Sequence, residues 1–341
     1  METLQSQLDE PLLVTAPVNV NYLTGFESTN PALFVEPDRA RLFSDFRYAA
    51  AGKRVEDVEF TVTKRNLFAS LADELSGRIG FEADAVTYAA FQTLEAGGLE
   101  LVPRRGVVEA LRAVKDEGEL ALIRRAGEIT SEAFARLAQE QFSGRTEKEV
   151  AWRLDSLYHE LGADGPAFPT IVAAGENGAT PHAHAGDCEI PAGTTVVVDS
   201  ACALGGYVSD CTRTFATGPL PDRLAEAYEV CLAAQQAGLD AVRPGVTGRE
   251  ADAAARDVIE AAGFGEEFGH GLGHGLGLLV HEAPRLSQES EDTLDVGNVV
   301  TVEPGIYLSG LGGIRIEDLV IVGDAGPEIL TTFTKELVTV A

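Results

Sequence analysis

The chain is poor in cysteine and has no long apolar runs, and each shortage excludes a class of protein. Its four cysteines are Cys188, Cys202, Cys211 and Cys231, and none of them forms a Cys-x-x-Cys pair. This pattern indicates reduced thiols and disfavours a disulfide framework. No run approaches the roughly 18 apolar residues of a membrane span, and the acidic, polar N-terminus lacks the pattern of a signal peptide. We therefore expect a cytoplasmic protein with no membrane partner.

Basic residues are also scarce. Lys and Arg together number 26 against 54 Asp and Glu, which gives a formal net charge of −28. Nucleic-acid binding requires basic side chains that neutralise phosphates, so we expect no nucleic-acid partner. The acidic excess fits either a highly soluble surface or adaptation to high salt, and the sequence leaves both open.

The pattern of apolar and amphipathic stretches changes near Lys115, which predicts two domains, 1–115 and 116–341. The first alternates short apolar runs with amphipathic stretches, which predicts strands at 11–14, 31–35 and 41–44 and helices at 66–75 and 89–99. Such alternation is typical of an α/β domain.

The second segment is predicted to have an α+β fold. Its predicted helices span 120–142, 147–161, 222–241 and 249–262, the last behind a capping box at Thr247 and Glu250. Its predicted strands span 194–199, 211–215, 299–302 and 314–322. Because strands and helices mix without a strict βαβ rhythm, a doubly wound sheet is disfavoured.

Five residues at or near the ends of apolar runs in the second segment share one chemical bias: Asp199, Asp210, His274, Glu303 and Glu317. Taken alone, each carboxylate could be a turn residue, a cap or part of a solvated strand face. Four carboxylates in one pocket would repel one another and take up protons, and two divalent cations would cancel that charge. Oxygen ligands with one imidazole suit Mn²⁺, Co²⁺ or Zn²⁺ in a two-metal hydrolytic site.

Histidines cluster in two short windows of the sequence. The glycine-rich stretch 269–278 fits neither a phosphate loop nor the dinucleotide fingerprint, so its glycines more simply let the backbone aim His270 and His274. His182 and His184 form one window, and His281 follows His270 and His274 in the other. His159 stands apart and is expected on a helix surface. Strand alternation would place Arg315 and Glu317 on one face.

Several segments together resemble the pita-bread metallopeptidase family (M24), which includes Xaa-Pro dipeptidases (prolidases), Xaa-Pro aminopeptidases and methionine aminopeptidases. They are Pro181-His182, Val198-Asp199, 209–215, 270–282, Val302–Tyr307 and Gly313–Asp318. Residues 19–26 and 43–48 resemble the N-terminal domain of the Xaa-Pro branch, which methionine aminopeptidases lack. The resemblance implies a C-terminal pita-bread domain and a smaller N-terminal creatinase-like α/β domain.

The resemblance also implies a role for each site residue. Asp199 would bind the first of two metal ions, Asp210 and Glu317 would bridge both, and His274 and Glu303 would complete the second. A bridging hydroxide would attack the scissile carbonyl, with His281 stabilising the oxyanion and Glu303 moving the proton. His182, His270 and His281 match the family's substrate-binding and proton-transfer histidines, with His182 and His281 also expected to be catalytic. Arg315 matches an arginine that orients carboxylates, and Arg285 is a candidate for binding a substrate carboxylate. Mn²⁺ is the metal we favour.

One position departs from the family pattern. The family usually shows Asp-x-Gly after the first ligand strand, whereas this chain has Asp199-Ser-Ala201. Because Ala201 is small, we expect a modest backbone adjustment and no loss of the ligand. His184 matches no family position and is expected to be a polar residue at the rim of the site.

The predicted function is hydrolysis of Xaa-Pro bonds in dipeptides, with Xaa-Pro aminopeptidase activity on short proline-containing peptides as the alternative. Three rivals stay open: a metal-independent amidinohydrolase of creatinase type, a non-catalytic peptide-binding domain, and a hydrolase of small non-peptide amides. The first two usually lose several metal ligands, and this chain keeps all five. A homodimer is expected from the resemblance alone.

Overall fold

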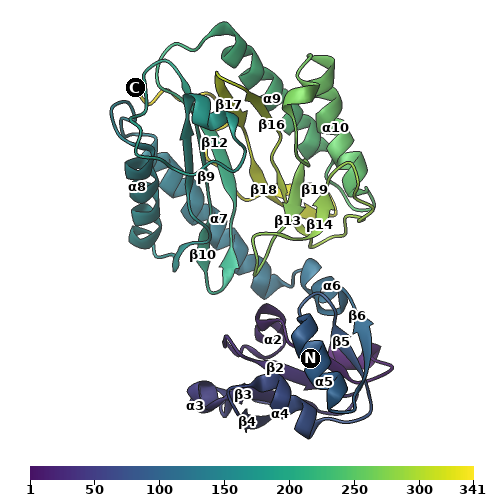
Figure 1. The fold of residues 1–341 in the computed structure, drawn as a ribbon. Helices are drawn as coiled ribbons and strands as arrows, with labels where there is room; N and C mark the ends of the chain where they lie inside the picture. Colours follow the sequence, from purple (N-terminus) through teal and green to yellow (C-terminus); the bar gives the residue numbers. More distant parts are fainter. The chain divides into compact units, whose positions relative to one another are not determined.

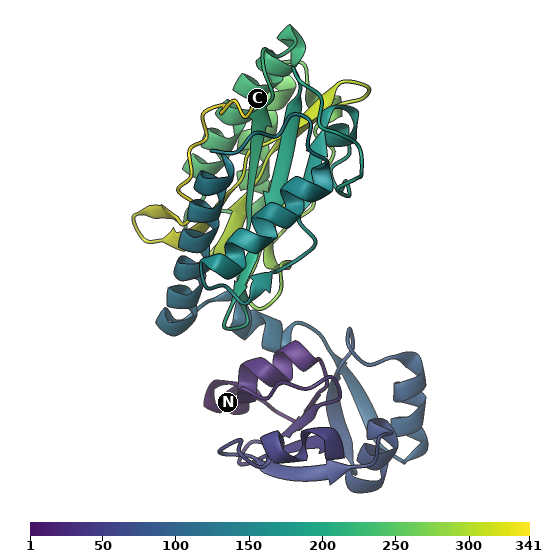
Figure 2. The same ribbon diagram turned by 90° about the vertical axis from the view of Figure 1, so that its left-hand side faces the viewer.

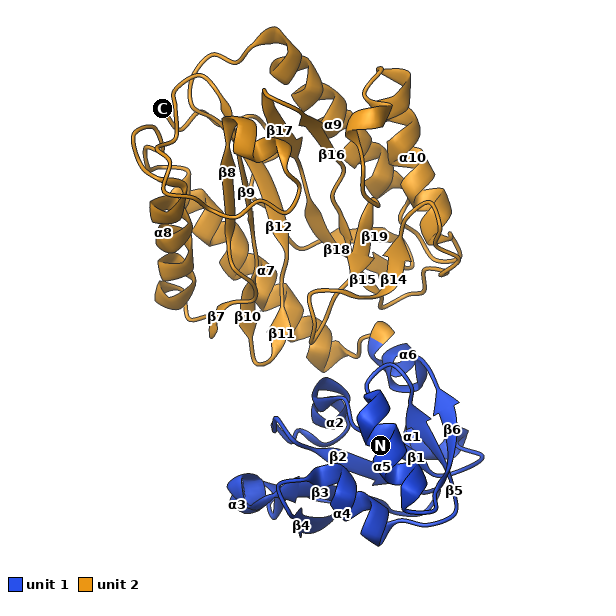
Figure 3. Ribbon diagram, viewed as in Figure 1, with its two compact units in different colours: residues 1–112 blue, residues 113–341 orange.

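Helices and strands in the computed structural model, which describes residues 1–341, separate into two units, Met1–Arg112 and Ala113–Ala341 (Figure 3). Each unit has its own buried apolar clusters, and none of these clusters combines residues from both. The division into functional domains at 1–115 and 116–341 stays a prediction.

Unit 1 is built on a six-stranded sheet in the order β4-β3-β2-β1-β5-β6. The strands are β1 (Leu12–Val14), β2 (Ala32–Val35), β3 (Ala40–Asp45), β4 (Glu59–Thr63), β5 (Arg78–Glu82) and β6 (Glu100–Arg104). Strands β1 to β3 pair antiparallel, while β3–β4, β1–β5 and β5–β6 are parallel pairs.

Helices cover both faces of this sheet. They are α1 (Glu2–Gln7), α2 (Pro17–Thr24), α3 (Ala49–Gly52), α4 (Leu67–Glu74), α5 (Tyr88–Ala96) and α6 (Val107–Ala113). Strand side chains alternate between faces. Leu13 accordingly packs with α4 and α5, whereas its neighbours Leu12 and Val14 pack with α1, α2 and α6. Unit 1 is therefore a three-layer α/β domain.

The first half of unit 2 packs two helices on one face of a small antiparallel sheet. The sheet is β12-β9-β8, formed by β8 (Ile171–Ala174), β9 (Thr195–Ser200) and β12 (Cys211–Ala216). Helices α7 (Glu117–Leu137) and α8 (Glu147–Glu160) share a buried cluster with it, and Figure 2 shows α8 in front of the strands. A smaller sheet joins β7 (Gly165–Pro166), β10 (Cys202–Leu204) and β11 (Tyr207–Val208).

The second half repeats this plan with helices α9 (Asp222–Ala241) and α10 (Gly248–Ala261). They share a buried cluster with a five-stranded sheet and a hairpin, on the side away from α8 (Figure 1). The sheet contains β13 (Gly273–Gly275), β14 (Glu282–Leu286), β15 (Val299–Val302), β18 (Asp318–Gly323) and β19 (Gly326–Ile329). The hairpin contains β16 (Gly305–Leu308) and β17 (Gly312–Arg315). None of the helices is both long and apolar enough to cross a membrane.

Three predicted elements differ from the structure. The helix predicted over 89–99 spans Tyr88–Ala96. The helix predicted to reach Phe142 ends at Leu137. Phe142 lies in the following loop with its side chain buried, and its backbone N–H donates to the carbonyl oxygen of Val340. The strand predicted over 314–322 is interrupted between Arg315 and Asp318, because β17 pairs with β16 while β18 pairs with β15 and β19.

Candidate metal centre and active site

Short strands and the gaps between them hold the five predicted metal ligands. Asp199 lies in β9, His274 in β13, Asp210 between β11 and β12, Glu303 directly after β15, and Glu317 between β17 and β18. In β9, Val196 and Val198 belong to the cluster packed with α7 and α8. Alternation therefore turns Asp199 to the opposite face of the sheet, away from that core.

Three of these side chains form a tight group. Asp210, His274 and Glu317 each offer a ligand atom, and these atoms lie within 4.8 Å of one another. His274 Nε2 is also 3.1 Å from Glu303 Oε1. Asp199 is the strongest neighbouring negative charge acting on Asp210. The structure thus brings all five side chains into one neighbourhood.

The carboxylates of this group lack enough positive charge around them. Asp199 Oδ1 and Asp210 Oδ1 are buried and have no hydrogen-bond partner, which is costly for a charged group. Burial, followed by repulsion from Asp199, raises the pKa of Asp210 well above its usual value. Burial, followed by repulsion from Asp210, does the same to the pKa of Glu317. Crowded oxygen donors with unsatisfied atoms and one imidazole fit divalent metal ions.

A proton on His274 supplies the positive charge within the group. Burial alone would lower the pKa of His274, but its hydrogen bond to Glu303 and the charges of Glu303 and Asp210 raise it to about 9. Burial likewise opposes ionisation of Glu303, yet the hydrogen bond from His274 lowers its pKa to about 2. A metal ion bound at Nε2 would take the place of this proton, as metal binding to histidine requires the neutral ring.

Arg315 connects the two sides of the group from β17. Its Nη2 donates to Asp199 Oδ2 at 2.5 Å and its Nε donates to Thr212 Oγ1 at 3.1 Å. Thr212 Oγ1 in turn donates to Glu317 Oε2 at 2.7 Å. Arg315 and Glu317 are therefore joined through Thr212, although the strand is interrupted after Arg315. The carboxylates of Asp199 and Glu317 each keep one oxygen for another partner.

The same arginine reaches a predicted substrate residue through Tyr307. Arg315 Nη1 donates to Tyr307 OH at 2.7 Å, and His270 Nε2 lies 2.9 Å from the same hydroxyl. Burial is the main cause that lowers the pKa of His270, so its ring is neutral at pH 7. Ligand and substrate residues thus belong to one hydrogen-bonded framework.

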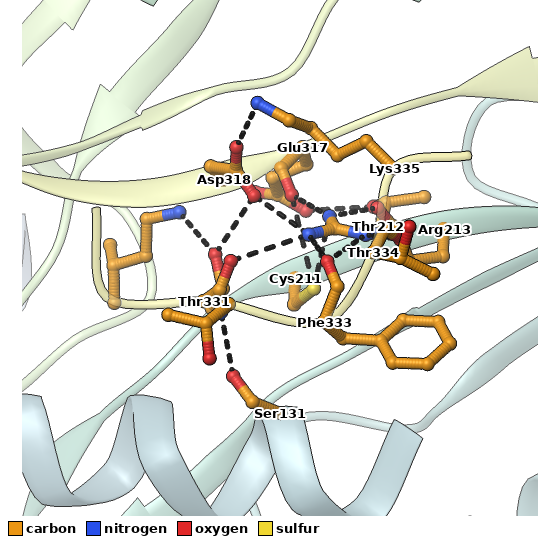
Figure 4. A network of polar contacts seen from close by, with 12 residues as sticks. Ser131, Cys211, Thr212, Arg213, Glu317, Asp318, Thr331, Phe333, Thr334 and Lys335 are labelled. Carbon is orange, nitrogen blue, oxygen red and sulfur yellow. Dashed lines mark hydrogen bonds and ion pairs between the residues drawn. The ribbon is translucent and has the colours of Figure 1, made fainter. Parts of the chain in front are cut away.

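Behind Glu317, a buried ion-pair network fixes the backbone (Figure 4). Arg213, on β12, donates to the carbonyl oxygens of Glu317 and Phe333 and to Asp318 Oδ1, the last at 2.8 Å. Asp318 Oδ2 also accepts a hydrogen bond from Lys335 Nζ at 2.9 Å. The C-terminal segment is therefore tied to the residue next to Glu317, on the side opposite the proposed ligand atoms.

The remaining predicted site residues are His281, His182 and Arg285. The rings of His281 and His274 are 4.4 Å apart in an edge-to-face arrangement. His182 is exposed, but its charge is among those that lower the pKa of His270 and His281, after burial as the main cause. Arg285 on β14 pairs directly with His274 on β13, which places both side chains on one sheet face.

Two further histidines are not brought into the group. His184 is exposed in the loop after His182, where its backbone oxygen accepts a bond from Asn177, and His159 is exposed on α8. The exposed position of His159 was expected. The rim role expected of His184 stays a prediction.

Sequence reasoning missed the supporting residues Thr212, Arg213, Tyr307 and Asp318. Each lies within or directly beside a segment that carries a predicted ligand. Alternation along β12 could have indicated that Thr212 faces the ligands while Arg213 faces away from them. Their partners, however, lie more than 100 residues further along the chain, so no local pattern identifies them.

Two protein families match the chain, one in each half. Residues 121–324 match the family described as "Metallopeptidase family M24". Residues 2–114 match the family described as "Creatinase/Prolidase N-terminal domain".

Individual relatives match over nearly the whole chain. An Xaa-Pro dipeptidase from Pyrococcus furiosus is 35% identical over 350 residues, covering 99% of each chain. Among solved structures, an Xaa-Pro dipeptidase from Bacillus anthracis has a TM-score of 0.94 at 37% identity, covering 99% of this chain and 98% of that one. An X-Pro aminopeptidase from Thermotoga maritima has a TM-score of 0.87 at 34% identity, covering 97% of both chains.

Proposed function

The chain belongs to metallopeptidase family M24, and from this premise we propose that it is an Xaa-Pro dipeptidase that requires two divalent metal ions. Family membership makes it a metal-dependent peptidase. The observation that carries the proposal is the ligand group around Asp210, whose buried carboxylate oxygen has no partner. Relatives named Xaa-Pro dipeptidase that match both units favour this substrate class.

We assign the ligands as follows: Asp199 to the first ion, Asp210 and Glu317 to both ions, and His274 and Glu303 to the second. The free oxygens of Asp199 and Asp210 and the proximity of Asp210, His274 and Glu317 support this assignment. Hard carboxylate oxygens with a single imidazole favour Mn²⁺, with Co²⁺ and Zn²⁺ as alternatives.

Two bound ions would lower the pKa of a water molecule and polarise the scissile carbonyl. Glu303 is proposed to accept the proton of the attacking water and deliver it to the leaving proline nitrogen. Its carboxylate accepts a hydrogen bond from Thr301 Oγ1 at 3.0 Å, which would remain when an ion takes the place of the His274 proton. His281, beside His274, would donate to the oxyanion that develops on the carbonyl oxygen.

Substrate selection is proposed to depend on residues around this centre. Proline after the scissile bond makes a tertiary amide, which carries no N–H for an enzyme to recognise. His182 and His270 would contact the substrate, and Arg315 would keep Asp199 and the His270–Tyr307 pair oriented. Arg285, on the same sheet face as His274, would bind the free carboxylate of a dipeptide.

The proposal extends to the domain division, the cellular compartment and the oligomeric state. The functional domains would span 1–115 and 116–341, in keeping with the two family matches. Four free cysteines fit a reducing, cytoplasmic compartment. The homodimer is carried over from the family resemblance, and sedimentation of the purified protein tests it.

The test compares hydrolysis of Ala-Pro and Ala-Pro-Ala by the Mn²⁺-loaded protein. Cleavage of the dipeptide alone supports the proposal, and Arg285→Ala should then raise KM for Ala-Pro. Cleavage of the tripeptide would instead indicate an Xaa-Pro aminopeptidase, a candidate favoured by the structural likeness to the Thermotoga maritima enzyme. If neither peptide is cleaved, the proposed substrate class is wrong and a small non-peptide amide becomes the candidate.

A further inference from the structure

We propose that Glu147 is a positioning residue that holds the loop carrying His182 in its working place. The proposal rests on the proposed function in one respect, because it takes His182 as a substrate-binding residue. Glu147 itself lies outside the ligand group and outside every segment that carries the family resemblance.

The buried carboxylate of Glu147 binds both ends of the loop that carries His182. Glu147 is the first residue of α8 and only 3% exposed. Its Oε1 accepts from the backbone N–H of Ala174 at 2.8 Å, and its Oε2 accepts from that of Gly186 at 2.7 Å. These two amides stand immediately before and at the end of segment 175–186, so the carboxylate joins the two ends of the loop.

Asn177 extends this hold into the loop. Its Nδ2 donates to both oxygens of Glu147, at 3.0 and 2.8 Å, and to the carbonyl oxygen of His184 at 3.2 Å. Within the loop, Thr180 N donates to Asn177 O at 3.1 Å and Ala183 N donates to Thr180 O at 3.2 Å. The backbone on both sides of His182 is therefore connected to Glu147.

The other side of the loop rests on the active-site framework. Arg315 Nη1 donates to the carbonyl oxygen of Pro181 at 3.2 Å. Gly178 packs so closely on β17 that a Cβ on Gly313 would lie 1.9 Å from the Gly178 carbonyl oxygen. Glu147 from α8 and Arg315 from β17 thus clamp the loop, and the exposed His182 falls in sequence between the anchored residues Pro181 and Gly186.

Helix capping does not account for Glu147. Thr146 already caps α8, with its hydroxyl accepting from Glu149 N at 3.2 Å and Glu149 Oε2 accepting from Thr146 N at 2.7 Å. A buried carboxylate is costly to desolvate, whereas an apolar residue could fill the same space without that cost. The three amide donors, from Ala174 at the end of β8 and from Asn177 and Gly186 in the loop, are what a carboxylate at this place can satisfy.

The test uses Glu147→Gln, which keeps the size but turns an acceptor oxygen into an amide that faces other N–H donors. Glu149→Gln, in the same helical turn and exposed, is the matched control for loss of one charge. We expect Glu147→Gln to lower kcat/KM for Ala-Pro roughly 10- to 100-fold, as small misplacements of a binding group do. Mn²⁺ stoichiometry should be unchanged, and amide hydrogen exchange should rise in 175–186 but not with Glu149→Gln.

A double-mutant cycle separates positioning from a general structural effect. In a His182→Ala background, Glu147→Gln should cost little further activity, because its effect passes through His182. An equal loss in both backgrounds, or behaviour of Glu147→Gln that matches Glu149→Gln, would overturn the proposal. If Glu147→Gln does not fold, Asn177→Ala, at a half-buried position, carries the same expectations.

The proposed function and this inference can fail separately. If the wild-type protein cleaves no Xaa-Pro peptide, the proposed substrate class is wrong. Hydrogen exchange still decides the clamp in that case: faster exchange in 175–186 for Glu147→Gln supports it, and unchanged exchange overturns it.

Discussion

Replacing Asp210 with asparagine should make the metal-free protein more stable while it abolishes activity. Asp210 is 4% exposed, and its Oδ1 has no partner. Burial, and then repulsion from Asp199, raises its pKa. A neutral amide of the same shape removes this unfavourable charge from the metal-free state and removes the proposed bridging ligand from the metal-bound state.

The size of the effect follows from the cost of a buried, uncompensated charge. Leaving one such charge unpaired in a protein interior costs about 3–5 kcal/mol. The asparagine amide would itself lack partners, which returns about 1–3 kcal/mol of that gain as an unsatisfied polar group. We therefore expect a net stabilisation of about 1–3 kcal/mol, which corresponds to roughly 2–12 °C in Tm for a unit of this size.

The pH dependence has a defined sign. A carboxyl whose pKa is higher in the folded than in the unfolded protein destabilises the fold above its unfolded pKa, and has no such effect below it. The Tm advantage of the variant should therefore be largest at neutral pH and be lost by about pH 4, where only the cost of the amide is left. Scanning calorimetry of chelator-treated protein from acid to neutral pH measures this, with the exposed Asp324→Asn as the control.

Added Mn²⁺ should reverse the order of stability. Wild-type protein gains stability from a ligand that binds only the folded state, whereas Asp210→Asn should gain little. A metal-free variant that is less stable than wild type at pH 7 would refute the argument about charge. A variant that keeps both full activity and the full Mn²⁺-induced rise in Tm would refute the ligand assignment.

Other predictions test the residues that support the ligand group. Thr212→Val, which removes the hydroxyl between Arg315 and Glu317, should lower kcat/KM about 10- to 100-fold; steady-state kinetics should show that Thr212→Ser keeps most activity, and equal losses would mean that the hydroxyl is not the cause. Lys335→Met should lower the free energy of unfolding by about 1–3 kcal/mol in urea titrations, because Asp318 is left with less positive charge; an unchanged midpoint would show that Arg213 alone suffices. Exhaustive chelation should abolish peptidase activity and Mn²⁺ should restore it, so activity that survives removal of all metal would contradict a metal-dependent reaction.

The predicted family and fold class, an α+β pita-bread domain behind a creatinase-like α/β domain, are confirmed by the family matches. Some helix positions were predictable from apolar spacing and capping signals. Helix α9 spans 222–241 as predicted, and α10 begins at the predicted capping box of Thr247 and Glu250. The helix predicted to reach Phe142 was wrong at its end, because that side chain packs 5.3 Å from the ring of Phe215 from outside the helix. Apolar spacing alone does not distinguish such a loop residue from one more helical turn.

The types of residue in the candidate site were predictable from the sequence, but the hydrogen bonds and strand pairings that join them were not. Carboxylates that end apolar runs are visible in the sequence, and the structure brings Asp199, Asp210, Glu303 and Glu317 together. The break between Arg315 and Asp318 was not visible, because it depends on which strands β17 and β18 pair with. Thr212 and Glu147 escaped notice for the same reason, since their roles come from partners that only the fold supplies.

The most direct measurement of the central claim is an anomalous difference map, recorded at the manganese edge, from crystals of the Mn²⁺-loaded protein. The account predicts two peaks roughly 3.5–4 Å apart, as in two-metal hydrolytic sites. Asp210 and Glu317 should contact both peaks, Asp199 one of them, and His274 and Glu303 the other. A single peak, or two peaks that Asp210 does not bridge, would contradict the two-metal assignment.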